Sequence, residues 1–243
     1  GDITNIEDCN KACDKIDVIL HQAALGSVPR SIENPINTNN VNVNGFVNML
    51  WAAKANNIKR VIYAASSSTY GDSKTLPKVE ENIGSPLSPY AVTKYVNELY
   101  ANVFASLYGL ELIGLRYFNV FGRKQDPDGA YAAAIPKFIK AFVNHESPII
   151  HGDGSQSRDF TYIDNVLQAN ILAATTTNYN AINQVYNVAC GKQSILIDLV
   201  KHIKKLLSDF DPEIEKIPIK FGKERIGDIK HSLASVHKIE RLL

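Results

Sequence analysis

The sequence predicts an α/β fold, a doubly wound parallel sheet followed by a smaller carboxyl-terminal α/β lobe. Up to about residue 125, short apolar runs typical of strands buried on both faces alternate with longer segments of helical pattern. Beyond residue 126 the elements become shorter and the alternation loosens. The alternation implies right-handed crossovers and a mostly parallel sheet. We therefore expect residues 1–125 to form the sheet domain. Residues 126–243 should form mainly the lobe, with some strands and helices returning to the sheet.

Composition narrows the class of protein. With 243 residues, of which 45% are hydrophobic and 21% charged, the chain is typical of a globular protein with a sizeable core. The formal net charge of +1 gives no general attraction to polyanions, so no nucleic acid is expected and a phosphorylated ligand must be held by local arginines. No apolar run approaches the roughly 18 residues of a membrane span, and no signal peptide is visible, which favours a cytoplasmic protein.

The three cysteines do not suggest a metal centre. Cys9 and Cys13 are four residues apart without a second ligand pair nearby, and Cys190 stands alone. We expect reduced thiols and no metal site.

The first half of the chain should contain the main elements of the sheet domain. We expect helices over residues 5–15, 35–56 and 89–108, and strands over residues 17–24, 60–65 and 112–117. The third helix has the clearest ends: Ser88 can act as its N-cap, Pro89 suits its first position, and Gly109 should end it.

The second half should combine the lobe with returning elements. We expect helices over residues 130–143, 164–174, 194–206 and 235–243, and strands over residues 148–151, 185–189 and 216–221. Asp164 and Ser194 are expected to act as N-caps of their helices, because short polar side chains accept hydrogen bonds from the free N–H groups there.

Tyr90 and Lys94 are the first candidate pair for chemistry. Their i, i+4 spacing places them on one face of the helix that follows Ser88. A phenol has an unperturbed pKa of about 10, and lowering it by about three units requires roughly 4 kcal/mol of differential stabilisation. A buried lysine together with a cationic cofactor ring could supply this. The alternative, a core-facing tyrosine beside a solvated lysine, is more common for this spacing taken alone.

Polar residues at strand ends form the second candidate cluster. Ser66 and Ser67 follow the strand over residues 60–65 and precede the glycine turn at Gly71. In an open α/β sheet, ligands bind beyond the carboxyl ends of the strands. These serines are therefore candidates for the site, although a strand-end serine can also serve only neighbouring backbone groups.

Taken together, these segments resemble the extended short-chain dehydrogenase/reductase family, in particular its nucleotide-sugar 4-epimerases. The matching motifs follow the family's order: Gly1-Asp2-Ile3, His21-Gln22-Ala23-Ala24, Asn42-Val43-Asn44-Gly45, Ser66 to Gly71, Tyr90 to Lys94, Tyr117-Phe118-Asn119, Arg158-Asp159-Phe160 and Arg225-Ile226-Gly227-Asp228. The resemblance covers essentially the whole chain, and motifs in a shared order are far more specific than any one of them. It implies a Rossmann-type domain that binds NAD and a lobe that binds a UDP-sugar.

The resemblance implies a catalytic role for four residues. Tyr90 would remove the proton of the sugar 4-hydroxyl while the C4 hydride passes to NAD, and Lys94 would support Tyr90 and reach the nicotinamide ribose. Ser66 would hydrogen-bond the reacting oxygen, and Ser67 is close enough to share that role. The resulting 4-keto sugar would turn over and receive the hydride on its other face. The dehydratase branch carries an Asp-Glu pair after this hydroxyl, whereas Ser67-Ser68 carries no carboxylate.

The resemblance also assigns binding roles. The residues that would contact NAD, in addition to the catalytic ones, are Asp2 and Ile3 at the adenine, Gln22, Ala23, Ala24 and Asn42 at the inner edge, and Tyr117 at the nicotinamide. The residues that would contact the UDP-sugar are Gly26, Ser27 and Ser67 at the sugar, Asn119 at the sugar or its phosphate, Ala133 beside an N-acetyl group, Arg158 and Arg225 at the diphosphate, and Asp228 at the uridine ribose. The alternatives are core packing and turn formation for the first set, and surface pairing with Asp159 or Asp228 for the arginines.

The substrate implied best is UDP-N-acetylglucosamine or UDP-N-acetylgalactosamine, with UDP-glucose and UDP-galactose also possible. Three alternatives stay open: a UDP-glucuronate 4-epimerase, another NAD-dependent nucleotide-sugar epimerase or dehydratase, and a nucleotide-sugar-binding protein without turnover. The family's amino-terminal strand and GxxGxxG turn are absent from these residues, so we expect a fragment that lacks its first strands and stops early. A homodimer is expected through the helices over residues 37–55 and 89–108, with Val96, Leu99, Val103 and Leu107 facing outward.

Overall fold

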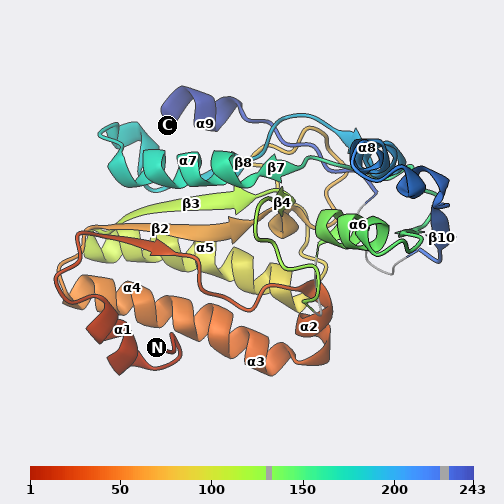
Figure 1. The fold of residues 1–243 in the computed structure, drawn as a ribbon. Coiled ribbons are helices and arrows are strands. Elements are labelled where there is room, and N and C mark those ends of the chain that lie inside the picture. The colour runs from red at the N-terminus through yellow and green to blue at the C-terminus, as the bar shows by residue number, and fades with distance from the viewer. Residues whose placement is uncertain (130–132, 225–229) are drawn as a thin grey trace.

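The computed structural model describes residues 1–129, 133–224 and 230–243. Its centre is a parallel sheet in the order β1-β2-β3-β8 (Figure 1). The strands are β1 (Val18–His21), β2 (Arg60–Ser66), β3 (Glu111–Tyr117) and β8 (Gln184–Val188). The predicted α/β class and parallel sheet are therefore confirmed, and each of these strands overlaps a predicted one. Their carboxyl ends lie at one edge of the sheet, where the polar candidates follow.

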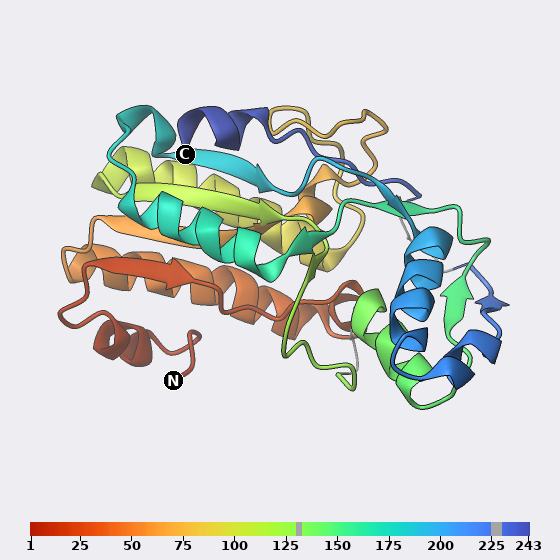
Figure 2. The same ribbon diagram turned by 45° about the horizontal axis from the view of Figure 1, so that its top comes forward.

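Helices cover both faces of this sheet, as Figures 1 and 2 show from two directions. On one face lie α1 (Ile6–Ala12), α4 (Gly45–Ala55) and α5 (Pro89–Tyr108), and on the other lie α7 (Ile163–Thr175) and α9 (His237–Leu242). Because successive strand residues point to opposite faces, Val61 and Tyr63 pack into the first cluster while Ile62 packs into the second. Continuous apolar strands are thus buried on both sides.

The helix expected to begin at Pro35 is composite. It consists of α3 (Pro35–Asn39), a π-helical segment η1 (Asn40–Asn44) and α4. A further short helix, α2 (Val28–Glu33), precedes it and was not predicted from the sequence. The wider π turn contains Asn42, which is buried and turned toward the loop after β1.

The second part of the chain builds a separate hydrophobic cluster at the right of Figure 1. The helices are α6 (Ala134–Val143), α8 (Leu196–Ser208) and the 3-10 helix η4 (Pro212–Lys216), beside the parallel pair β5 (Ile149–His151) and β10 (Lys220–Gly222). Phe142, Ile150 and Val200 are completely buried between these elements. Within the described residues, no helix combines the length and apolar character needed to cross a membrane.

Two predicted helix caps are wrong. The N-cap of α7 is Tyr162 and that of α8 is Ile195, and neither makes a side-chain cap hydrogen bond. Asp164 lies inside the first turn of α7, and Ser194 belongs to a short strand. The reason is that short strands lead directly into both helices: β7 (Thr161–Tyr162) pairs with β4 (Val120–Phe121), and β9 (Ser194–Ile195) pairs with β6 (Ser157–Arg158). The strand expected over residues 216–221 begins only at Lys220: η4 ends at Lys216, and residues 217–219 belong to no helix or strand.

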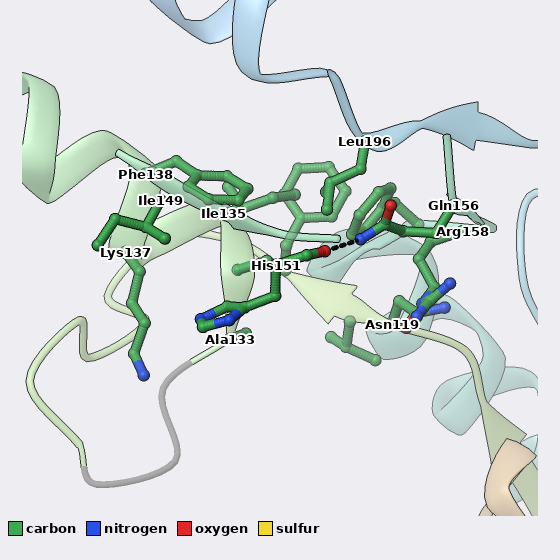
Figure 3. Close-up of a pocket in the computed structure, with 14 residues that line it drawn as sticks. Asn119, Ala133, Ile135, Lys137, Phe138, Ile149, His151, Gln156, Arg158 and Leu196 are labelled. Carbon is green, nitrogen blue, oxygen red and sulfur yellow. Dashed lines mark hydrogen bonds between the residues drawn. The ribbon is translucent and has the colours of Figure 1, made fainter. Parts of the chain in front are cut away.

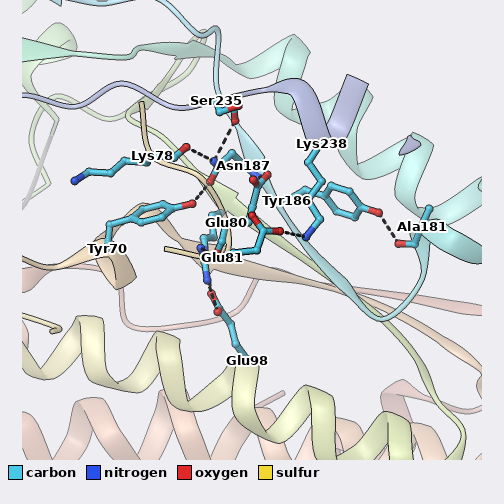
Figure 4. A network of polar contacts seen from close by, with 11 residues as sticks. Tyr70, Lys78, Glu80, Glu81, Glu98, Ala181, Tyr186, Asn187, Ser235 and Lys238 are labelled. Atoms are coloured by element: carbon cyan, nitrogen blue, oxygen red, sulfur yellow. Dashed lines mark hydrogen bonds and ion pairs between the residues drawn. The ribbon is translucent and has the colours of Figure 1, made fainter. Parts of the chain in front are cut away.

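A buried polar network ties α5 to the sheet and to the segment before α9 (Figure 4). Arg116 of β3 makes a two-pronged ion pair with Glu98 of α5, at 2.9 and 2.7 Å, and also donates to the carbonyl of Glu80 at 2.9 Å. The Glu80 carboxylate accepts from the Asn187 backbone N–H at 2.9 Å, and the Asn187 side chain donates to the carbonyl of Ser235 at 3.1 Å. These hydrogen bonds therefore hold together α5, the sheet and the segment before α9, which are distant in sequence.

Candidate active site

Tyr90 and Lys94 lie where the sequence places them, in the first turns of α5. The Ser88 hydroxyl accepts a hydrogen bond from the Ala91 N–H at 3.1 Å, and Gly109 ends the helix in the left-handed conformation with φ of 69°. These ends were both predicted. The Lys94 ammonium donates to the carbonyl of Ala64 on β2 at 2.9 Å and lies 6.0 Å from the centre of the Tyr90 ring.

Burial dominates the electrostatics of this pair. It raises the pKa of Tyr90, while a hydrogen bond from the Ser66 side chain acts in the opposite direction. Burial also lowers the pKa of Lys94 to about 8. The nearby His21 has its pKa lowered to about 4 by burial and by Lys94, so its imidazole is neutral at physiological pH. The expected lowering of the Tyr90 pKa is therefore not found in this chain alone, because burial outweighs the Ser66 hydrogen bond.

Ser66 and Ser67 have different surroundings although they are adjacent. Ser66 ends β2 and caps the 3-10 turn η2 (Ser67–Tyr70), and its Oγ accepts from the N–H and the hydroxyl of Ser68 at 3.2 and 2.8 Å. The Ser66 side chain is also a hydrogen-bond partner of Tyr90. Ser67 instead lines a small cavity beyond the sheet.

The loop after β1 is held by Asn42. Its side-chain oxygen accepts from the Leu25 N–H at 2.7 Å, and its amide group donates to the Leu25 carbonyl and the Thr93 hydroxyl, both at 3.1 Å. Asn42 is 2% exposed and clamps this loop between η1 and α5. The small residues Ala23 and Ala24 lie in the same loop, exposed and half-buried respectively.

Gln22 and Tyr117 meet through a residue that sequence reasoning missed. The Gln22 amide donates to the side-chain oxygen of Asn170 at 3.1 Å, and the Asn170 amide donates to the Tyr117 hydroxyl at 2.9 Å. Asn170 belongs to α7, far away in sequence, and no local pattern marks it as part of the site. These bonds link the ends of β1 and β3, on either side of β2, through α7.

Asp2 and Ile3 lie beside α1 and α4. The Asp2 carboxylate is exposed and accepts from the N–H and the hydroxyl of Thr4, both at 2.9 Å. Ile3 packs over Gly45, where a Cβ atom would come within 2.6 Å of its side chain. Their contact with adenine stays a prediction.

Two neighbouring cavities lie beyond the carboxyl ends of the strands. The larger, of about 430 Å³, is lined by Asn119, Ala133, His151, Gln156 and Arg158 among others (Figure 3). The smaller, of about 150 Å³, is lined by residues that include Ser67, Lys78, Asn119, Arg158, His231 and Ser232. Asn119 and Arg158 border both cavities.

The residues shared by the two cavities are held by their own neighbours. The Asn119 amide donates to the carbonyl of Asp159 at 3.0 Å, and Asn119 adopts a positive φ of 35°. The Arg158 guanidinium donates to the carbonyls of Ser157 and Lys230 at 2.9 and 3.2 Å. The Asp159 carboxylate is completely buried and accepts from the backbone N–H groups of Cys190, Gly191 and Ala234.

Of the remaining predicted sugar-binding residues, the structure describes some and leaves others out. Gly26 is exposed with open space where a side chain would project, and Ser27 caps α2 through its bond to the Arg30 N–H. Arg225 and Asp228 lie outside the described residues. Among the described residues, no group of three or more His, Cys, Asp or Glu side chains is placed to hold a metal ion.

Sequence reasoning also missed residues of the cavities. His151 ends β5, so the rule that polar residues follow strands would have found it. His151 and Arg158 project toward the same side of the larger cavity (Figure 3). His231 and Ser232 gave no such signal, because backbone pairing with Ser157 brings them to the smaller cavity.

Comparison with known proteins identifies the family. The model of the NAD dependent epimerase/dehydratase family matches residues 1–189. A putative UDP-glucose 4-epimerase of Methanocaldococcus jannaschii is 40% identical over 191 residues, which are 77% of this chain and 61% of that protein. A UDP-glucuronate 4-epimerase of Thermodesulfobacterium geofontis is 33% identical over 245 residues, 100% of this chain and 72% of that protein.

A solved structure of an epimerase is also similar to this chain in fold and sequence. It is a UDP-N-acetylglucosamine 4-epimerase from Methanobrevibacter ruminantium M1 in complex with UDP-N-acetylmuramic acid, 43% identical with a TM-score of 0.91. The match covers 99% of this chain and 74% of that chain.

Proposed function

This chain belongs to the NAD dependent epimerase/dehydratase family, and from that premise we propose that its protein interconverts UDP-N-acetylglucosamine and UDP-N-acetylgalactosamine by inverting C4. The observation that carries this proposal is the pair of neighbouring cavities that share Asn119 and Arg158, the smaller of which is lined by Ser67 of the turn after β2. A nucleotide in the larger cavity would pass its diphosphate by Arg158, so that the sugar reaches the serine turn. The 43% identity to a UDP-N-acetylglucosamine 4-epimerase supports the same substrate.

Residues in the loop after β1 and in the first turns of α5 fit NAD as the cofactor. Ala23 and Ala24 have small side chains that would leave room for an aromatic ring, and Lys94 is a buried ammonium with three N–H donors, one of which goes to Ala64. The further donors suit the hydroxyl groups of a ribose. NAD would supply a reversible acceptor for the C4 hydride and a positively charged ring near Tyr90. That charge is what the phenol needs to ionise, since burial alone raises its pKa.

The residues of the chain would move the proton and orient the sugar. The Tyr90 phenolate would accept the proton of the 4-hydroxyl, and Ser66 would hydrogen-bond the same oxygen as it becomes a carbonyl. Lys94 would favour the charged phenolate across the 6.0 Å that separates its ammonium from the ring centre. After the 4-keto sugar turns over, C4 would regain its hydride on the other face and Tyr90 would return the proton to O4, which completes the inversion with no net change of atoms or charge.

The choice of an N-acetylated sugar rests on Ala133. This residue is exposed, precedes α6 and lines the larger cavity, where its small side chain leaves room. Replacing it by a bulky residue, Ala133→Tyr, should lower kcat/KM for UDP-N-acetylglucosamine about tenfold more than for UDP-glucose, a difference of about 1.4 kcal/mol. Equal losses for both sugars would contradict this reading of the pocket.

The direct test is proton NMR of UDP-N-acetylglucosamine with the protein expressed from its complete gene, without added NADH. Appearance of the C4 epimer would show epimerisation with recycled NAD. An unchanged sugar, together with inversion of UDP-glucuronate or UDP-glucose, would reject the proposed substrate. Tyr90→Phe is the matched control, because it keeps the ring and removes the proton acceptor.

UDP-glucuronate is the second candidate substrate. The smaller cavity carries the basic side chains Lys78, Arg158 and His231, which could pair with a carboxylate at C6. Arg123 and Lys124, considered for this role from the sequence, instead line another groove, and Arg123 pairs with Asp164 at 2.7 Å. Comparing the two sugars at equal concentration separates the candidates, and Lys78→Met should reduce turnover of the glucuronate alone.

A further part of the proposal is a homodimer. The outer face of α5 exposes Leu99, Val103 and Leu107, and α4 exposes Trp51 beside it. Such an apolar row is typical of an interface between helices.

A further inference from the structure

We propose that Ser68 is a positioning residue, which fixes the direction in which the Ser66 hydroxyl donates its proton. The proposal rests on the proposed function, in which Ser66 works beside Tyr90 at the reacting oxygen. In the sequence Ser68 belongs to the segment from Ser66 to Gly71, and it borders the smaller cavity, but its side chain is assigned neither to the sugar nor to the cofactor.

The hydrogen bonds of Ser66 carry the argument. A hydroxyl oxygen has one proton to donate and two lone pairs that accept. The Ser66 Oγ accepts from the Ser68 N–H at 3.2 Å and from the Ser68 hydroxyl at 2.8 Å, so both lone pairs are used. The Ser66 hydroxyl can then act only as a donor toward Tyr90 or the sugar oxygen. Without the Ser68 hydroxyl, one lone pair becomes free, and Ser66 could accept the phenol proton instead.

The serine turn does not need the Ser68 hydroxyl for its shape. The Thr69 hydroxyl donates to the Ser66 carbonyl at 2.8 Å, and the Tyr70 hydroxyl donates to the Asn187 side chain at 2.6 Å. The Ser68 backbone N–H continues to cap the turn after the side chain is shortened. Removing the Ser68 hydroxyl should therefore change orientation more than stability.

The charged groups near Tyr90 explain why the direction of one proton matters. From its own helix Tyr90 faces Lys94, and from β1 the neutral His21 lies near that lysine. The end of β2 and the η2 turn present hydroxyl groups, from Ser66 to Thr69. A donated hydrogen bond from Ser66 stabilises the phenolate and lowers the pKa of Tyr90. The same serine as an acceptor would stabilise the protonated phenol.

The test uses Ser68→Ala in the protein expressed from its complete gene, with NAD bound. Tyrosine labelled with carbon-13 at Cζ reports ionisation by NMR, and Tyr90→Phe identifies the signal of Tyr90 among the 11 tyrosines. We expect Ser68→Ala to raise the pH at which Tyr90 titrates by about one unit, equivalent to about a tenfold loss of phenolate. The pH profile of kcat for UDP-N-acetylglucosamine should shift by the same amount, with KM unchanged. Ser68→Thr, which restores a hydroxyl, should recover the original titration.

Thr69→Val is the matched control, because it removes a neighbouring hydroxyl bonded to the Ser66 carbonyl instead of its side chain. It should lower the melting temperature without moving the Tyr90 titration. An unchanged titration in Ser68→Ala, or an equal shift in Thr69→Val, would overturn the proposal. The NMR readout needs no turnover, so a shift specific to Ser68→Ala supports the positioning role even if the protein inverts none of the UDP-sugars tested.

Discussion

Lys94 is a residue whose proposed role in activity comes at the expense of stability. It is 4% exposed, and burial lowers the pKa of its amine from 10.5 to about 8. Between these values the unfolded chain binds more protons than the folded chain, so the free energy of unfolding should rise with pH from about 8 to 10.5. The contribution of the neutral amine is fully present above pH 10.5 and is lost as the pH falls through about 8.

Replacing Lys94 by Met should therefore stabilise the NAD-free protein and inactivate it. At pH 7 we expect the free energy of unfolding to increase by about 1–3 kcal/mol, because a buried ammonium with one hydrogen bond becomes an apolar side chain. Turnover should fall at least about a hundredfold with loss of support for the phenolate. Urea unfolding at pH 7 and 10 measures the first effect. Lys59→Met, at an exposed lysine, is the control and should change stability by less than about 0.5 kcal/mol.

Stability depends on two glycines, Gly114 in a strand and Gly109 at a helix end, for different reasons. A Cβ atom at Gly114 of β3 would come within 2.6 Å of the ring of Tyr63, which is 2% exposed. Gly109 has open space around it but a φ of 69°. We expect Gly114→Ala to lower the free energy of unfolding by about 1–3 kcal/mol, because the added methyl group overpacks the core. Gly109→Ala should lower it by about 1–2 kcal/mol, because alanine is strained at this positive φ. Asn should be tolerated better than Ala at Gly109 and worse at Gly114, and thermal unfolding of the four variants distinguishes the two causes.

A buried ion pair links α5 to β3. Arg116 and Glu98 are 3% and 4% exposed, so Glu98→Gln leaves a buried guanidinium without its counter-charge (Figure 4). We expect this single change to lower the free energy of unfolding by about 3–5 kcal/mol. The double variant Glu98→Leu with Arg116→Met should be close to the original stability, because neither charge is then buried. A loss below about 1 kcal/mol in chemical denaturation of the single variant would contradict the argument.

Local sequence predicts the long elements and fails for the short ones. Strands β2 and β3 are apolar runs buried on both faces, and α5 carries its own end signals in Ser88 and Gly109. The pairs β4–β7 and β6–β9 are two residues long, too short for any periodicity, and they also displaced the predicted caps at Asp164 and Ser194. Packing between distant segments determined these short strands and the starts of the helices that follow them.

The candidate site divides in the same way. Ser66, Tyr90 and Lys94 belong to a strand end and a helix start that are visible in the sequence. Asn170 and Ser232 reach the site only through contacts with segments remote in the chain. Their roles could not be predicted because nothing in their own surroundings in the sequence requires them there.

At the scale of the whole molecule, we propose that the chain divides near residue 125, with its second part returning to the first. The cluster around α6 and α8 is separate from the two clusters that cover the sheet. Yet β8 completes the sheet, and α7 and α9 cover one of its faces. The larger cavity is lined from both parts, by Asn119 after β3 and by residues of α6 and β5. A change in the angle between the parts would therefore alter the space for the ligand.

The proposed dimer is tested on the outer face of α5. Val103 and Leu107 are 49% and 68% exposed, whereas Val96, expected to point outward, is half-buried. Val103→Asp would place a charge in the middle of this face, and burying an unpaired carboxylate strongly disfavours association. We expect the variant to sediment as a monomer under conditions in which the original protein is a dimer. Phe210→Asp, at an apolar residue that is 89% exposed on the other part of the molecule, should leave the dimer intact. Monomeric sedimentation of the original protein, or a dimer unaffected by Val103→Asp, would contradict an interface built on α5.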